Sequence, residues 1–167
     1  MANKKNAGFS LVELIIVIAI LGGGFAAAYF TGLLDGILGV SKSSPEYPVW
    51  AFAKAIQKND TGLVDEFIAE PVDSNKEANK EYVSFVKEFI KGLAEEAEGA
   101  KIKYEIKETT EASSSTLSEA GQLYKDLTEA KNIKAKLIMT KDGKEEAADF
   151  TFIVVKQNGN WKLYDIK

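Results

Sequence analysis

Near its N-terminus the chain carries the stretch Gly8-Phe9-Ser10-Leu11-Val12-Glu13, and a run without charged side chains follows it from Leu14 to Leu34. A helix needs roughly 20 consecutive apolar residues to cross the hydrocarbon core of a bilayer, so the run is long enough to span a membrane. Glu13 directly precedes the run. Burying a carboxylate in a membrane costs free energy unless a positive group neutralises it. Lys4 and Lys5 precede the run and predict a cytoplasmic N-terminus, with the rest of the protein outside the cytoplasm.

These residues resemble the N-terminus of type IV prepilins and of the pseudopilins of type II secretion. The resemblance implies that a prepilin peptidase cleaves after Gly8 and that the new N-terminal residue, Phe9, is N-methylated. It also implies that Glu13 pairs with the N-terminal ammonium of a neighbouring subunit during assembly. Such a pairing is physically coherent, because a buried carboxylate and a buried ammonium each need a partner. Ala7 departs from the family, in which many members have Lys or Arg at this position.

Two other interpretations of the N-terminus stay open. One is a secretory signal peptide with the apolar region at Leu14–Leu21 and a small-residue cleavage site at Ala26-Ala27-Ala28. The other is a plain signal anchor that is never cleaved. Glu13 counts against the signal peptide, because it lies inside what should be the apolar region.

Composition limits the function classes. The chain has 167 residues, a net charge of −4, and neither Cys nor His. Without Cys or His, thiol nucleophiles, disulfides, thiolate or imidazole metal sites and the commonest general base are all excluded. Lys and Glu alternate rather than cluster, so no basic stripe indicates nucleic-acid binding. We therefore expect a non-enzymatic protein with no cofactor, no metal and no nucleic-acid partner.

The sequence divides into four segments. Residues 1–8 are the expected leader, 9–34 the transmembrane and assembly helix, 35–47 a linker and 48–167 an extracytoplasmic domain. The linker contains glycines, serines and Pro45, which end helices and favour a flexible tether. In this it differs from pilins, whose first helix usually continues as a spine packed on the globular domain.

The periodicity after the linker predicts helices first and strands second. Helical spacing covers 48–58, 63–68 and a longer segment after a capping-box pattern at Ser74-x-x-Glu77. The spacing then changes to alternation, interrupted by a helix with a possible cap at Thr116-x-x-Glu119, and Asp142-Gly143 and Asn158-Gly159 predict two hairpins. The result is an α+β domain with helices packed on a curved four-stranded antiparallel sheet. In the closing strand we expect Trp161 to contact Val154 or Val155 across the hairpin.

The domain is also similar to small extracytoplasmic domains of the nuclear-transport-factor-two-like, or cystatin-like, superfamily. The similarity rests on the opening helix, the turn at Lys58-Asn59-Asp60 and the final hairpin at 154–166; the four-stranded meander of a pilin is the competing description. Some members are enzymes with a Tyr and an Asp in a conical cavity, for which the candidates here are Tyr104, Asp149, Tyr164 and Asp165. Ordinary burial favours tyrosines in the core and carboxylates in solvent.

Calcium ligands are the remaining candidates. Asp142 with Asp149, or Glu95 with Glu96 and Glu98, supply carboxylates, but no fixed loop spacing accompanies them. Solvated charge is the favoured interpretation of both groups.

The sequence predicts a protein that functions by assembly. It is a single-pass minor pilin or pseudopilin that takes part in a pilus or in a secretion or uptake pseudopilus. The implied partners are a prepilin peptidase, other pilin-like subunits and the lipid bilayer. The alternative is a membrane-anchored cystatin-like module that binds a small ligand or an envelope protein and does not polymerise.

Overall fold

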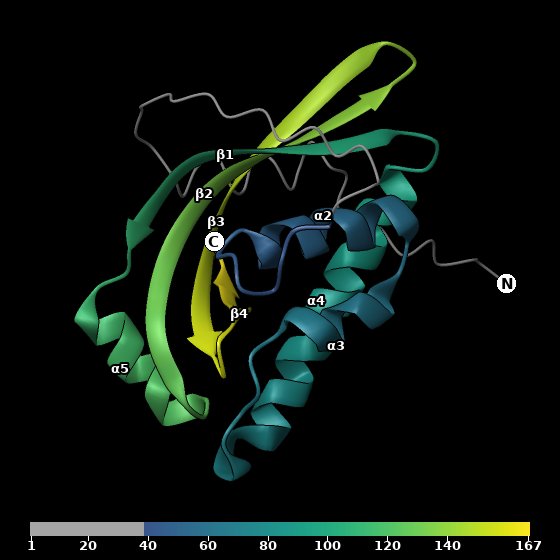
Figure 1. Ribbon diagram of the computed structural model, residues 1–167. Coiled ribbons are helices and arrows are strands. Elements are labelled where there is room, and N and C mark those ends of the chain that lie inside the picture. Colours follow the sequence, from purple (N-terminus) through teal and green to yellow (C-terminus); the bar gives the residue numbers. More distant parts are fainter. Residues whose placement is uncertain (1–38) are drawn as a thin grey trace, which may run out of the picture.

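The alternating segments in the second half of the chain form one antiparallel sheet. Its strands pair in sequence order, so that each neighbour along the chain is also a neighbour in the sheet. The computed structural model describes residues 39–167, and in Figure 1 the sheet curves around the helices. The strands are β1 (Lys101–Glu111), β2 (Leu127–Lys141), β3 (Lys144–Gln157) and β4 (Asn160–Ile166).

Both predicted hairpins are confirmed. Asp142 and Gly143 have φ values of 51° and 75°, and Asn158 and Gly159 have 51° and 80°. Two successive residues with positive φ define the two-residue turn that matches the twist of paired strands, and Asn-Gly and Asp-Gly adopt it most readily. These turns fix the register of β2 with β3 and of β3 with β4.

The helices precede the sheet, except for one that lies between β1 and β2. Helices α2, α3 and α4 lie on the inner side of the curved sheet, and α5 covers one end of it (Figure 1). The predicted α+β architecture is therefore confirmed. The bounds are α2 (Tyr47–Lys58), η1 (Thr61–Leu63), α3 (Val64–Phe67), η2 (Asp73–Asn75), α4 (Lys76–Glu96) and α5 (Ser114–Leu123).

Both predicted helix caps are wrong. Ser74 lies within η2, and α4 begins after Asn75 without a side-chain cap, because the chain enters the helix directly from the preceding 3-10 turn. At α5 the cap is Ser113, whose hydroxyl accepts a hydrogen bond from the Thr116 N–H at 3.2 Å. Ser113 has the extended backbone that a cap requires, so the helix begins earlier than Thr116.

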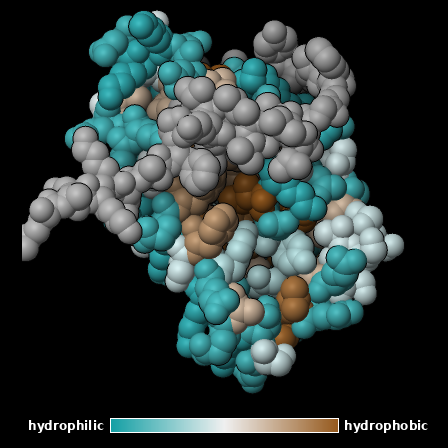
Figure 2. Space-filling model, turned by 180° about the vertical axis from the view of Figure 1, so that it is seen from behind, coloured by the Kyte–Doolittle hydropathy of each residue, from teal (hydrophilic) through white to brown (hydrophobic). Residues whose placement is uncertain are grey.

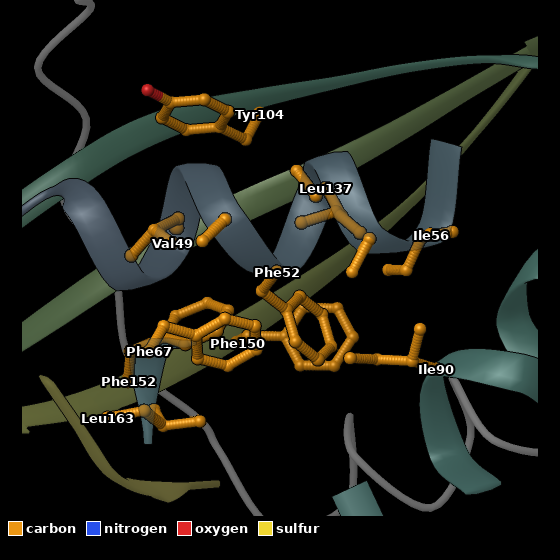
Figure 3. Packing of buried hydrophobic residues seen from close by; sticks show 14 of the residues in the cluster. Val49, Phe52, Ile56, Phe67, Ile90, Tyr104, Leu137, Phe150, Phe152 and Leu163 are labelled. Atoms are coloured by element: carbon orange, nitrogen blue, oxygen red, sulfur yellow. The ribbon is translucent and has the colours of Figure 1, made fainter. Parts of the chain in front are cut away.

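Aromatic rings from helices and strands meet in the core. Phe52 of α2 lies at its centre, with its ring 5.4 Å from that of Phe152 in an edge-to-face arrangement (Figure 3). Phe67 and Leu163 close one side, and Ile90 of α4 closes the other (Figure 3). All five side chains are fully buried, so the domain has a core built from every layer.

Two short segments cover the edge strand β4. The Ala69 N–H donates to the Leu163 carbonyl at 3.0 Å, beside a parallel bridge between Ile68 and Leu163. On the same strand the Trp161 N–H donates to the Lys42 carbonyl at 2.7 Å. Covered edges do not offer unpaired backbone groups to another chain.

Neither Val154 nor Val155, the expected cross-strand contacts of Trp161, lies directly opposite it in the hairpin. The two-residue turn pairs Gln157 with Asn160, which places Trp161 opposite Lys156 and leaves Val154 opposite Leu163. The Trp161 ring is nevertheless buried in the main core. The Lys156 ammonium lies 5.9 Å from its centre, within range of a cation–π contact.

Candidate functional site

The expected processing and assembly residues Gly8, Phe9 and Glu13 lie outside the described residues. The same holds for the expected membrane helix, 9–34. Within residues 39–167 no helix is both long and apolar enough to cross a membrane. The part of the chain that the structure describes thus begins inside the expected linker.

That part of the linker is attached to the domain. Residues 41–46 form turns rather than a helix, and Val40 packs on the main core. Besides its carbonyl bond to β4, Lys42 forms an ion pair with Glu66 at 3.2 Å. Helix α2 therefore begins at Tyr47 as a separate helix.

The four catalytic candidates do not converge. Tyr104 is 5% exposed in the main core, opposite Leu137 of β2. Asp149 is exposed on β3, opposite Lys136. Only Tyr164 and Asp165 lie together, since they are consecutive in β4. Burial raises the pKa of Tyr104 to about 12, so its phenol stays protonated at neutral pH.

Tyr164 is displaced by a β-bulge. Ile153 pairs with Asp165 and Val154 pairs with Leu163, which leaves Tyr164 as the extra residue of β4. Bulges change the direction of side chains and are frequent beside functional sites. The Tyr164 ring packs edge-on against Tyr124, with 5.6 Å between the ring centres.

A third tyrosine joins this pair from α4. Burial raises the pKa of Tyr82 above its ordinary value, and the charges of Asp165, Tyr124 and Tyr164 add to the effect. The Tyr82 hydroxyl is buried without a hydrogen-bond partner among the described residues, and so is Oδ1 of Asn79. We call Tyr82, Tyr124, Tyr164 and Asp165 the tyrosine cluster.

The phenols of the tyrosine cluster supply no base near neutral pH. Burial is the largest cause of the raised pKa of Tyr82, Tyr124 and Tyr164, so each phenol keeps its proton near neutral pH. A protonated phenol donates and accepts hydrogen bonds. An unpartnered buried hydroxyl is costly, by about 1 to 3 kcal/mol, and the Tyr82 hydroxyl is such a group among the described residues.

Sequence reasoning missed Tyr82 and Tyr124. Helical spacing identifies the buried face of each helix but not a hydroxyl at the far end of a ring. The bulge at Tyr164 has no sequence mark either. No pattern in the sequence connects α4, α5 and β4 at this point.

The carboxylates considered for calcium do not gather. Asp142 is exposed at the tip of the β2–β3 hairpin. Glu95 and Glu98 lie at the end of α4, in a polar hollow that they share with Gln57 and Lys58 of α2. Among residues 39–167, no group of three or more acidic side chains is arranged to hold a metal ion.

A second hollow is apolar. It lies between the ends of α2 and α4 and the strands that lead to the β2–β3 hairpin, and it has about 20 Å³ of space, enough for little more than one water molecule. The lining of this hollow includes Ile56, Leu93, Ile102, Met139 and Phe150.

Seen from behind, the surface carries a separate group of hydrophobic residues near its centre, surrounded largely by hydrophilic ones (Figure 2).

Comparison with known families gives one match. Residues 3–29 match the family described as the prokaryotic N-terminal methylation motif. No curated protein and no solved structure matches the chain. The protein therefore carries a type IV pilin-like prepilin motif, and the resemblance stated from the sequence is confirmed for this segment. The motif implies anchoring in a membrane through the N-terminal segment, whereas the cystatin-like identity of the domain stays a prediction.

Proposed function

We propose that the protein is a minor pilin or pseudopilin, a subunit that acts by assembly rather than by catalysis. The observation that carries this proposal is the methylation motif at residues 3–29. Cleavage after Gly8 frees Phe9, which is then N-methylated, and Glu13 neutralises the ammonium of an adjacent subunit. The helix at 9–34 packs into a pilus or a secretion pseudopilus, and the domain is displayed outside the cytoplasm.

The structure supports a minor rather than a major subunit. A major pilin usually has a first helix that continues onto the globular domain as a spine. Residues 41–46 form turns here, and α2 begins at Tyr47. The domain also has its own core, drawn from α2, α4 and the sheet, so it does not depend on a continuous spine for its packing.

The mature N-terminus tests this proposal. We predict that protein extracted from the membrane begins at Phe9 and carries one N-methyl group, which intact-mass and N-terminal peptide analysis detect. In cells without prepilin peptidase the same protein should keep Met1 or Ala2. A start at Met1 or Ala2 in normal cells would instead favour a plain anchor, and a start at Tyr29 a secreted protein.

One observation favours a second candidate, a membrane-tethered binding module that does not polymerise. The Tyr82 hydroxyl and Asn79 Oδ1 are buried without partners among the described residues, and a polar ligand would satisfy them. The two candidates differ in where the protein is found. A pilin-like subunit appears in surface fibres released by shearing, together with other pilin-like subunits, whereas a tethered module stays entirely in the membrane fraction.

A further inference from the structure

Two aromatic rings, flanked by two ammonium groups, form a row along the first half of α2 and the segment before it. Of the two rings, Tyr47 is 4% exposed and Trp50 is partly exposed. The Lys54 ammonium lies 4.2 Å from the centre of the Trp50 ring. The Tyr47 ring lies 5.8 Å from Trp50, and the Lys42 ammonium lies 5.8 Å from the Tyr47 ring. We call Lys42, Tyr47, Trp50 and Lys54 the aromatic–lysine row.

The row lies where the chain enters the domain. A Cβ added at Gly39 would lie 3.6 Å from two atoms of the Trp50 ring, so the backbone at Gly39 is in contact with this ring. Only five residue steps separate Gly39 from Leu34, the end of the charge-free run. A fully extended chain covers at most about 3.6 Å per residue, or ~18 Å in all. Trp50 is therefore held within reach of the membrane surface.

The chemistry of the row suits that surface. Indole rings, which have a polar edge, accumulate at the boundary between hydrocarbon and water, and Lys extends its ammonium toward phosphates while its stem stays on apolar surface. Trp50 and Lys54 are both partly exposed. Lys42 shares its charge with Glu66, whereas the structure gives Lys54 no ion-pair partner within residues 39–167.

We propose that Trp50 and Lys54, the accessible part of the aromatic–lysine row on α2, rest on the phospholipid headgroups of the membrane in which the protein is anchored. The Trp50 ring lies at the level of the headgroups, and Lys54 binds their phosphate oxygens. This inference rests on the proposed membrane anchoring by residues 9–34. It fixes the orientation of the domain, with α2 toward the membrane, which a flexible tether alone would leave free.

Fluorescence tests the proposal on the full chain. The protein has two tryptophans, Trp50 and Trp161, and Trp161 is 3% exposed in the core. The chain is reconstituted into phosphatidylcholine and phosphatidylglycerol vesicles that contain phosphatidylcholine spin-labelled on its headgroup. Because only Trp50 would lie at the label, we expect at least about twofold stronger quenching of the wild type than of Trp50→Phe.

Charge variants distinguish binding of Lys54 to headgroup phosphates from mere closeness of Trp50 to the membrane. Lys54→Glu should reduce the quenching of Trp50, because a carboxylate is repelled by phosphate. Lys91→Glu is the matched control, since Lys91 is exposed on α4 and should leave the quenching unchanged. A chain that floats with the vesicles but is quenched no more than Trp50→Phe would overturn this inference alone. A chain that does not float with the vesicles would overturn the anchoring as well.

Discussion

Individual buried groups set the chemistry of this domain. Tyr104 and Tyr82 are both removed from water, but they differ in their surroundings. Tyr104 lies in β1, opposite β2, and is packed in the main core, whereas the pKa of Tyr82 in α4 is also affected by the charges of two other tyrosines and Asp165. Burial raises the pKa of both phenols. The Tyr82 hydroxyl thus has no hydrogen-bond partner among the described residues, whereas Tyr104 is part of the main core.

The raised pKa of Tyr104 predicts that the folded domain loses stability at high pH. Its folded-state pKa of about 12 lies above the ordinary value of 10.0, so the folded protein holds the proton more tightly than the unfolded chain does. The stabilisation is complete below about pH 10 and is lost as the pH rises toward 12. Denaturant unfolding across this range should show a smaller decline for Tyr104→Phe than for wild type. Equal declines would contradict the prediction.

Glu13 is the residue that we propose to pair with the ammonium of an adjacent subunit during assembly. Glu13→Ala should leave cleavage after Gly8 and membrane insertion intact but reduce incorporation into fibres. Removal of the carboxylate leaves a neighbouring ammonium unpaired, a loss of about 3 to 5 kcal/mol for a fully buried pair and less where water or headgroups reach it. Quantification of the protein in sheared surface fractions measures the effect. The proposal fails if the variant and the wild type are recovered in equal amounts there.

Among the elements, the ends of strands are held by glutamine side chains. Gln157, at the end of β3, is 2% exposed. Its Oε1 accepts from the Glu70 N–H at 2.8 Å, and its Nε2 donates to the Glu70 and Lys125 carbonyls at 3.0 and 2.7 Å. Gln57 of α2 has a similar role at the start of β1, because it donates to the Ala100 carbonyl and accepts from the Ile102 N–H. Each glutamine joins segments that the sheet itself does not pair.

Gln157 is buried and Gln57 is exposed. The same substitution at the two positions therefore compares the stability cost of losing a buried and an exposed amide. Gln157→Leu should destabilise the domain by about 1 to 3 kcal/mol for each buried backbone group that it leaves without a partner. Gln57→Leu should cost less, because residue 57 is exposed and water can replace the amide. Chemical denaturation measures both variants. The explanation is contradicted if Gln57→Leu is the more destabilising of the two.

At the scale of the whole molecule, the helices and the sheet of the domain bury their apolar faces against one another. The core takes side chains from α2, α3, α4 and all four strands, and the segments around Lys42 and Ile68 cover the edge of β4. No disulfide is possible, because the sequence has no Cys. The stability of the domain therefore comes from packing and backbone pairing.

Truncated fragments test whether the domain folds without the N-terminal segment. Residues 46–167 should fold as a soluble monomer, because the apolar faces of the helices and the sheet satisfy one another. Residues 39–167 should be more stable, since they retain the Lys42 carbonyl that accepts the Trp161 N–H at 2.7 Å. Light scattering and thermal unfolding compare the two fragments. If both fragments were unfolded, the domain would depend on the residues before Gly39 for its stability, and the prediction would be wrong.

The local features of the chain follow from its sequence. Asp142-Gly143 and Asn158-Gly159 form turns because they tolerate positive φ, and the change from helical spacing to alternation separates α4 from β1. The N-terminal motif is likewise local, and its residues 3–29 suffice for a family match. These features depend on neighbours within a few residues, which is why sequence spacing predicts them.

The tertiary structure adds what depends on contacts between distant segments. The bulge at Tyr164, the approach of Tyr82 to Asp165 and the pairing of Trp161 with Lys156 all arise from register and packing. The choice of Ser113 over Thr116 as a cap depends on where β1 ends, because several neighbouring hydroxyls could serve. Short-range patterns determine which segments are helix, strand and turn, whereas the meeting of polar side chains requires the curvature of the whole sheet.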